Sequence, residues 1–354
     1  MGAHTPTASG GAPGRRERPA TGRALLLLLR SCSIRFTAYY WVGFTVGLAA
    51  NDRLNPTWAL LGVPLWVAYC VGTESLNRLA DREADVINRP ERTRLCEEFG
   101  WARLMRVCVG AWAVFALIGA ALVWQHPGIA LPVMLLIDMG VAIGYSIGPA
   151  FKRHRVLSLI ALTTPMVTPL LTGWAIHGDG DTLASPVLPV AAVLASFSLG
   201  LAGIKDITDV EGDRELNYSS LWLALVTFGR GAALYTLIGL PFLLLALSAA
   251  LGGLPVVTLV LLPLVVVSAL VVTAASRAET PPDREAAREV MHNYTFYFLA
   301  LALLVAVPGT PTACVFAAGV VFWLLASKGL HWSGGLSVAH LGRWGALSVK
   351  TAGK

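Results

Sequence analysis

Charged residues are scarce in this chain of 354 residues: they make up only 14% of it, whereas the hydrophobic set makes up 55% and the mean hydropathy is +0.65. Soluble domains usually contain about 25% charged residues, so the shortage argues against an ordinary soluble enzyme. The high apolar content also excludes disorder over most of the chain. The apolar residues come in runs of about 18–25, the length that crosses a hydrocarbon core about 30 Å thick. The sequence therefore predicts a polytopic membrane protein.

Cysteine is also rare, and its spacing excludes two further classes of protein. The five cysteines form no C-x-x-C pair, which argues against a disulfide framework and a structural zinc site. The net charge of +6 does not come from basic stripes interleaved with aromatic residues, so we expect no nucleic-acid partner. Lysine accounts for only five of the 27 basic residues. This arginine bias favours a GC-rich bacterial source, and hence the plasma membrane.

Ten apolar segments are long enough to be transmembrane helices, at about residues 33–50, 56–77, 101–124, 128–149, 156–176, 185–206, 229–251, 254–276, 290–308 and 310–328. With the N-terminus in the cytoplasm, 26 of the 27 basic residues lie on the cytoplasmic side, and only Arg53 does not. We therefore predict an all-α bundle of nine or ten transmembrane helices with cytoplasmic termini. We expect a disordered tail over 1–30, the main membrane domain over 31–308, an additional transmembrane helix over 309–330 and a C-terminal tail over 331–354.

A first acidic row follows the second span. Asn77, Asp81 and Asp85 are spaced at i, i+4 and i+8, which places all three on one stripe of a continuous helix. Oxygen-bearing side chains crowded in this way suit a hard cation such as Mg²⁺, which also takes phosphate oxygens and water as ligands. Taken alone, the row is equally typical of a solvated helix end.

A second acidic row, Asp206, Asp209 and Asp213, follows the sixth span. Both rows lie at the cytoplasmic ends of even-numbered spans, so they can face each other across a bundle. Together they could hold two or three Mg²⁺ ions around a diphosphate. The pair of rows is much more specific than either row alone, and we expect the two to converge at one mouth of the bundle.

A basic segment closes the fourth span on the same side and contains Tyr145, Lys152 and Arg153. A departing diphosphate needs cations beyond the metal ions, and lysine and arginine at a membrane rim supply them. The same residues would also serve as ordinary topology anchors. Arg89 and Arg94, which follow the first acidic row, are open to the same two interpretations.

These motifs in combination resemble the UbiA superfamily of intramembrane prenyltransferases over about residues 33–308. The resemblance rests on N-x-x-x-D-x-x-x-D, Y-S-x-x-P with a basic pair, and K-D-I-x-D-x-E-G-D. It implies a helical bundle with a central cavity that opens to the membrane, and a substrate that is a prenyl diphosphate. The implied Mg²⁺ ligands are Asn77, Asp81, Asp85, Asp209 and Asp213, supported by Asp206. Diphosphate contacts are expected from Lys152 and Tyr145, with further candidates in Arg153, Arg89, Arg94, Lys205 and Arg214.

The chain departs from the family pattern in two places. The second acidic row is followed by Glu215-Leu216-Asn217 instead of a glycine and lysine stretch, and the first by Arg94-Leu95-Cys96 instead of R-P-L. Both departures lie in the cytoplasmic loops, where the acceptor would enter. They leave the metal residues intact and leave the identity of the acceptor open.

Two acidic residues inside the spans are candidates for contacting the acceptor, because ionisable groups are costly within a membrane. Glu74 precedes Asn77 by three residues, and Asp138 precedes Tyr145 by seven. We expect one of them to face the cavity as a proton acceptor or to orient a hydroxyl group. For Asp138 a structural hydrogen bond to a neighbouring helix is an equal alternative. His292 and Asn293 are weaker candidates of the same kind.

The favoured function is Mg²⁺-dependent transfer of a prenyl group from a prenyl diphosphate to an aromatic or other nucleophilic acceptor. Aromatic residues in the first and ninth spans would offer π faces to the allylic cation, although such residues usually serve packing. One alternative is a terpene cyclase of the same superfamily, which would use the same acidic rows. Another is a cation transporter, although transporter acids usually lie near the membrane midplane rather than at helix ends.

Overall fold

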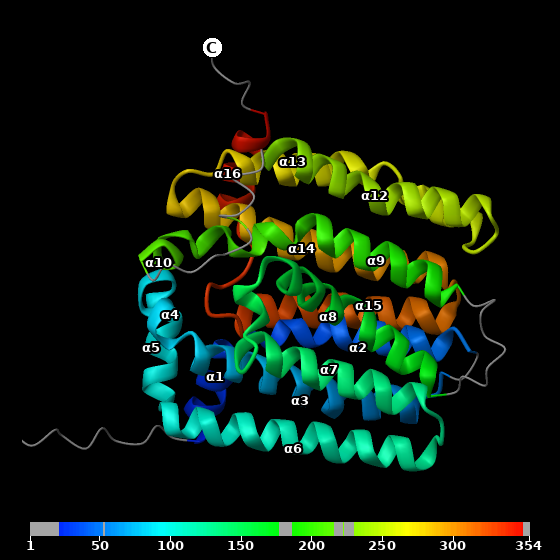
Figure 1. The fold of residues 1–354 in the computed structure, drawn as a ribbon, viewed down its shortest axis with the longest axis horizontal. Helices are drawn as coiled ribbons and strands as arrows, with labels where there is room; N and C mark the ends of the chain where they lie inside the picture. The colour runs from blue at the N-terminus through cyan, green and yellow to red at the C-terminus, as the bar shows by residue number, and fades with distance from the viewer. Residues whose placement is uncertain (1–20, 52–53, 177–185, 216–221, 223–229, 350–354) are drawn as a thin grey trace, which may run out of the picture.

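The computed structural model describes residues 21–51, 54–176, 186–215, 222 and 230–349. All regular secondary structure in these residues is helical, as predicted. The long helices run side by side along one direction, and short helices gather at one end of the bundle (Figure 1).

Each of the ten predicted spans overlaps a helix, although some of these helices are shorter than predicted. These helices are α2 (Thr37–Ala49), α3 (Pro56–Ala80), α6 (Trp101–Gln125), α7 (Ala130–Ser146), α8 (Arg155–Ala175), α9 (Val187–Ala202), α12 (Arg230–Ala250), α13 (Leu264–Ser276), α14 (Pro281–Ala306) and α15 (Thr310–Gly329). Two of the spans are extended by 3₁₀ turns, η4 (Gly203–Thr208) after α9 and η5 (Val256–Leu261) before α13. By length and composition, seven helices of the described chain are able to cross a membrane, α15 among them. The protein is therefore an integral membrane protein.

Local sequence signals set the starts of the helices that carry the site. At the start of α3 the Asn55 side chain accepts a hydrogen bond from the Trp58 amide (2.9 Å), and Pro56 occupies the first helical position. At the start of α14 the Thr280 hydroxyl oxygen caps the Asp283 amide in the same way. These caps satisfy amides that have no partner within the helix.

We call the end of the bundle that carries the short helices the cap; it lies at the left of Figure 1. Its elements are α1 (Thr21–Ser31), η1 (Ile34–Phe36), α4 (Arg82–Asn88), α5 (Pro90–Phe99), η2 (Phe151–Arg153), α10 (Val210–Glu215) and α16 (Val338–Val349). The cap therefore contains Asp85, Asp213 and the basic segment after α7, and Asp81 and Asp209 lie at the junctions that lead into it.

The structure differs from the sequence prediction in the two tail regions. Residues 21–30 form most of α1 instead of a disordered tail, because Leu27 is buried and α1 packs on α5. Part of the predicted C-terminal tail forms α16, which packs on α13 and α14. The Arg277 guanidinium holds the end of α16 by donating to the Leu347 carbonyl oxygen (2.9 Å). Residues 1–20 and 350–354 lie outside the described residues.

Helices α2 and α8 pack backbone to backbone through two glycines. A Cβ atom on Gly173 would overlap the Phe44 carbonyl oxygen, and one on Gly47 would overlap the Leu170 carbonyl oxygen. Only glycine permits this approach, which brings the two helices together beside the central cavity.

Candidate active site

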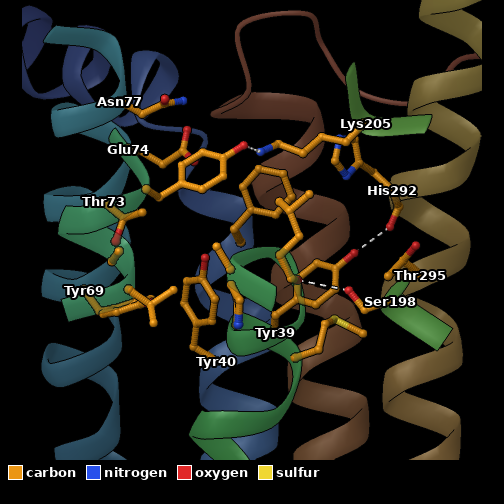
Figure 2. A pocket seen from close by; sticks show the side chains of 18 of the residues that line it. Tyr39, Tyr40, Tyr69, Thr73, Glu74, Asn77, Ser198, Lys205, His292 and Thr295 are labelled. Atoms are coloured by element: carbon orange, nitrogen blue, oxygen red, sulfur yellow. Dashed lines mark hydrogen bonds between the residues drawn. The ribbon is translucent and has the colours of Figure 1, made fainter. Parts of the chain in front are cut away.

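A central cavity of about 180 Å³ lies among α2, α3, α7, α8, α9 and α14 (Figure 2). Its walls include the rings of Phe36, Tyr39, Tyr40 and Tyr69. Away from the cap, Tyr40 and Tyr69 pack edge to face with ring centroids 5.0 Å apart, and Tyr69 packs on the fully buried Trp66. This aromatic cluster borders the cavity on the side facing away from the cap.

The cap side of the cavity is polar and contains four of the predicted residues. Asn77 and Glu74 of α3 lie across the cavity from Lys205 (Figure 2). The Lys205 ammonium donates to the Tyr145 hydroxyl (2.8 Å) and lies 4.6 Å from the centre of the Tyr145 ring. We call this region the mouth, defined by Glu74, Asn77, Tyr145 and Lys205.

Asp81 connects the first acidic row to the basic segment after α7. The helix predicted to carry the whole row breaks at this residue, because α3 ends at Ala80 and α4 begins at Arg82. The Asp81 carboxylate forms an ion pair with the Lys152 ammonium. The structure therefore brings together one metal candidate and one diphosphate candidate that are 71 residues apart in the sequence.

Asp209 connects the second acidic row to the first through Arg89. The Arg89 guanidinium donates to both carboxylate oxygens of Asp209, at 2.6 and 2.8 Å. Burial alone would lower the pKa of Arg89, but Asp209 and Asp85 raise it above its ordinary value. Beside this pair, the Gly212 amide donates to the Asn88 side chain (2.8 Å), which joins α10 to α4. Asp206 lies within electrostatic range of both Asp209 and Asp81.

Asn77 of the first row lines the cavity, but Asp85 does not. Asp85 is buried, it accepts from the Arg92 guanidinium through both oxygens (2.5 Å each), and it lies 3.7 Å from a nitrogen of Arg78. Burial alone would raise the pKa of Asp85, but these arginines lower it below its ordinary value. The break at Asp81 explains why the predicted single stripe does not carry Asp85 to the mouth.

Two further basic candidates are not brought to the cavity. Arg94 and Arg214 are exposed on the cap and do not line it. The side chains of Arg153 and Asp213 lie outside the described residues.

Of the two intramembrane acids, Glu74 lines the cavity and Asp138 does not. Glu74 forms an ion pair with Arg78 one turn further along α3. Asp138 is fully buried and accepts hydrogen bonds from Thr168 and Thr172 (3.3 Å for the latter). Asp138 therefore joins α7 to α8, which is the structural alternative that the sequence left open.

Sequence reasoning missed several polar residues of the cavity wall. Tyr69 and Thr73 continue the i, i+4 spacing of Asn77 backward along α3, so this spacing could have found them. Ser198 and Thr295 give no comparable signal (Figure 2). His292 lines the cavity, and its backbone carbonyl oxygen accepts a hydrogen bond from the Tyr39 hydroxyl (2.7 Å).

The chemistry of the mouth fits a hard divalent cation that shares its ligands with phosphate. The Asn77 amide oxygen is buried and has no hydrogen-bond partner among the described residues. Within the described part of the chain, no three histidine, cysteine or acidic side chains cluster closely enough to hold a metal ion by themselves. Mg²⁺ commonly binds through one or two carboxylates and completes its coordination with substrate phosphates and water. The oxygen donors of the mouth match that mode of binding.

The fold and the cavity define a helical membrane protein in which a cavity with aromatic walls opens at a polar mouth, beside the ion pairs of Asp81 and Asp209. The chain belongs to the UbiA prenyltransferase family, whose model matches residues 39–294.

The chain is also similar to three known proteins. It is 28% identical over 183 residues to homogentisate phytyltransferase from a Synechocystis strain, a match that covers 49% of this chain and 56% of that protein. The fold is similar to that of a UbiA homolog from Archaeoglobus fulgidus bound to GPP and Mg²⁺, with a TM-score of 0.59, 18% identity, and coverage of 85% of this chain and 99% of that one. It is also similar to a structure described as digeranylgeranylglyceryl phosphate synthase, with a TM-score of 0.57, 16% identity, and coverage of 81% and 98%.

Proposed function

We propose that this protein transfers a prenyl group from a prenyl diphosphate to an aromatic acceptor and releases diphosphate. The observation that carries the proposal is the cavity itself, which has aromatic walls and ends in a mouth containing Asn77, Lys205 and Tyr145. Ionisation of an allylic diphosphate separates charge, so it needs positive charge at the diphosphate end and little water at the allylic end. The polar mouth offers the positive charge of Lys205, and the aromatic walls keep water from the opposite end.

The ion pairs of the cap supply charge of both signs. Asp81 and Asp209, with Asn77 and Asp206, would hold Mg²⁺, while their partners Lys152 and Arg89 would contact phosphate oxygens. When bound, Mg²⁺ would stabilise the negative charge of the leaving diphosphate. Lys205 would donate a further hydrogen bond to that group, and the Tyr145 hydroxyl keeps its ammonium at the mouth.

The aromatic walls would protect the allylic cation after ionisation. Phe36, Tyr39, Tyr40 and Tyr69 offer π faces that stabilise a cation and exclude water. Their faces also form a surface on which a flat acceptor ring can stack. An aromatic acceptor is further supported by the similarity to a homogentisate phytyltransferase.

Glu74 is our candidate for the residue that orients the acceptor or accepts its proton. Among the described lining residues it is the carboxylate that faces the cavity, three residues before Asn77. The ion pair with Arg78 holds the Glu74 side chain at the cavity wall, where its oxygens can accept a hydrogen bond from a hydroxyl group.

We place the cap on the cytoplasmic side of a bacterial plasma membrane. This assignment rests on the distribution of basic residues between the two sides of the ten spans. A diphosphate made in the cytoplasm would then enter at the mouth, while its apolar chain remains within the bundle or the lipid.

The test combines membranes containing the protein with Mg²⁺, geranyl, farnesyl or geranylgeranyl diphosphate, and homogentisate as the probe acceptor. We expect a prenylated aromatic product and released diphosphate only when donor and acceptor are both present. Glu97→Gln, an exposed acid on α5, is the matched control and should retain full activity. A cyclic hydrocarbon or alcohol formed without acceptor would instead identify a terpene cyclase. Full turnover by Asp209→Ala would contradict the proposed site and favour cation transport.

A further inference from the structure

The chain beyond α15 returns to the cap and contacts the arginines that surround the first acidic row. The relevant segment, residues 330–333, lies outside the residues that the family model matches. It is anchored by His331, which is buried, and by the Ser333 hydroxyl, which lies 3.4 Å from a Glu289 carboxylate oxygen. We call residues 330–333 the return loop.

Trp332 of the return loop lies against two arginines from different helices. The guanidinium carbon of Arg288 on α14 lies 5.1 Å from the centre of its ring, and that of Arg92 on α5 lies 5.8 Å from it. Both distances fall within the range of cation–π attraction. Arg92 and Arg288 are themselves buried, so water screens these contacts poorly.

Each of the two arginines also pairs with a carboxylate. Arg92 donates to both oxygens of Asp85 in the first acidic row. Arg288 donates to Glu285 (2.6 Å) and Glu289 (3.2 Å), and Glu289 also accepts a bidentate pair from the fully buried Arg35 (2.9 and 3.1 Å). Trp332 therefore bridges an ion network centred on α14 and the arginine that holds Asp85.

The position of Trp332 also borders the second acidic row. Trp332 and Ser333 line a cleft in the cap whose walls include Arg89 and Thr208. Arg89 is the residue that pairs with Asp209. The return loop thus contacts the surroundings of both rows without entering the central cavity.

We propose that Trp332 is a positioning residue for the diphosphate-binding mouth. Its ring holds the Arg92 guanidinium on Asp85, and this fixes α4, and with it Asp81 and Arg89, relative to α14. Because Arg92 and Asp85 are buried, the π face of Trp332 is a partner that an aliphatic side chain of similar bulk would not replace. The kinetic part of this proposal rests on the proposed prenyl transfer; the effect on α4 does not.

The kinetic test compares Trp332→Phe, which keeps a π face, with Trp332→Leu, which does not. We expect Trp332→Leu to raise KM for the prenyl diphosphate about tenfold with kcat reduced less, as for the loss of one partly desolvated cation–π contact. Trp332→Phe should restore most of the affinity. Trp344→Leu is the matched control, because Trp344 belongs to the same C-terminal region but lies in α16. Equal KM values for the Phe and Leu variants would overturn the proposal.

A second measurement does not depend on turnover. Hydrogen exchange of the amides of residues 82–88 in the detergent-solubilised protein should be faster in Trp332→Leu than in the wild type and in Trp344→Leu. Unchanged exchange would overturn the proposal even if activity fell. If the wild type turns over no prenyl diphosphate but the exchange difference is present, the proposed function fails and the positioning role stands. Uniformly faster exchange throughout the chain would show general destabilisation and would also overturn it.

Discussion

In both acidic rows the central aspartate lies where one helix ends and the next begins, but the two rows differ in which residues bind their carboxylates. Asp81 lies between α3 and α4, and Asp209 lies between η4 and α10, so each central aspartate stands at a helix junction. Each pairs with a cation that is distant in the sequence, Lys152 for Asp81 and Arg89 for Asp209. At their centres the two rows are therefore built alike.

Beyond the central aspartate the rows differ. Asp85 of the first row is buried and held by Arg92 and Arg78. Among its described side chains, the second row meets the rest of the cap through the Arg89 pair, with Gly212 against Asn88 beside it. The first row is thus fixed by buried ion pairs of its own, and the second row packs against it through Arg89 and Asn88. We expect substitutions in the first row to affect both stability and activity, and those in the second to affect activity alone.

The largest effect should come from the central aspartates. Because both would share one cation and diphosphate site, Asp81→Ala and Asp209→Ala should each lower kcat by about 10²–10³-fold, and the double variant should be little worse than either. Removal of Mg²⁺ with EDTA should abolish turnover, and added Mg²⁺ should restore it. Steady-state kinetics with each variant provide the measurement. Losses that multiply in the double variant would mean that the two rows act independently.

A change in the first row, Asp85→Ala, should lower the thermal stability of the protein more than a change in the second row. Removing one partner of a buried ion pair commonly costs about 3–5 kcal/mol, so the variant should unfold at a lower temperature than Asp209→Ala in the same detergent. The folded pKa of Asp85 is lowered, so its contribution is complete above the unfolded pKa of about 3.9 and is lost as the pH falls through the folded pKa. Thermal unfolding followed as the pH falls from 7 should show this component in the wild type and in Asp209→Ala but not in Asp85→Ala. Equal melting temperatures for the two variants would refute the distinction.

A smaller effect should come from the contact that joins the rows. A Cβ atom on Gly212 would lie 2.7 Å from the Asn88 side-chain nitrogen, so Gly212→Ala should push α10 away from α4. We expect about a tenfold loss of activity, equivalent to about 1.4 kcal/mol. The double variant Gly212→Ala with Asn88→Ala removes the overlap and should recover part of the loss. No recovery would indicate that the Asn88 hydrogen bond, and not the spacing, matters.

The smallest effect should come from Asp138, which belongs to neither row. Asp138→Asn keeps an acceptor for Thr168 or Thr172, so activity should change by less than about threefold. Glu74→Gln, assayed alongside it, should lose much more because Glu74 faces the cavity. A larger loss for Asp138→Asn than for Glu74→Gln would reverse the assignment of the cavity acid.

The sequence predicted the membrane helices well because their signal is local and strong. A run such as Trp101–Gln125 has to be a helix wherever it lies in a bilayer, since its backbone groups find no other partners there. The i, i+4 spacing likewise pointed to Asn77 and Asp81. The positions of these residues depend mainly on their own helices.

The partners of the acids could not be predicted in the same way. The pair between Arg89 and Asp209 joins residues 120 positions apart and depends on how α10 packs on α4. Asp85 turns away from the mouth because the helix breaks at Asp81, and no proline or glycine marks that break. Trp332 meets Arg92 only because the chain beyond α15 folds back. Each of these contacts depends on tertiary packing, so no local pattern in the sequence indicates it.

The Lys152–Asp81 and Arg89–Asp209 pairs also affect how an anion would bind and leave in the proposed reaction. In these pairs the protein supplies its own counter-ions to the carboxylates of Asp81 and Asp209. An incoming anion must compete with carboxylates for the same lysine and arginine, which weakens its net affinity. The same competition acts on the departing anion, because re-formation of the two pairs favours its release. In the proposed reaction, the two pairs would therefore weaken the binding of the diphosphate substrate and speed the release of the diphosphate product.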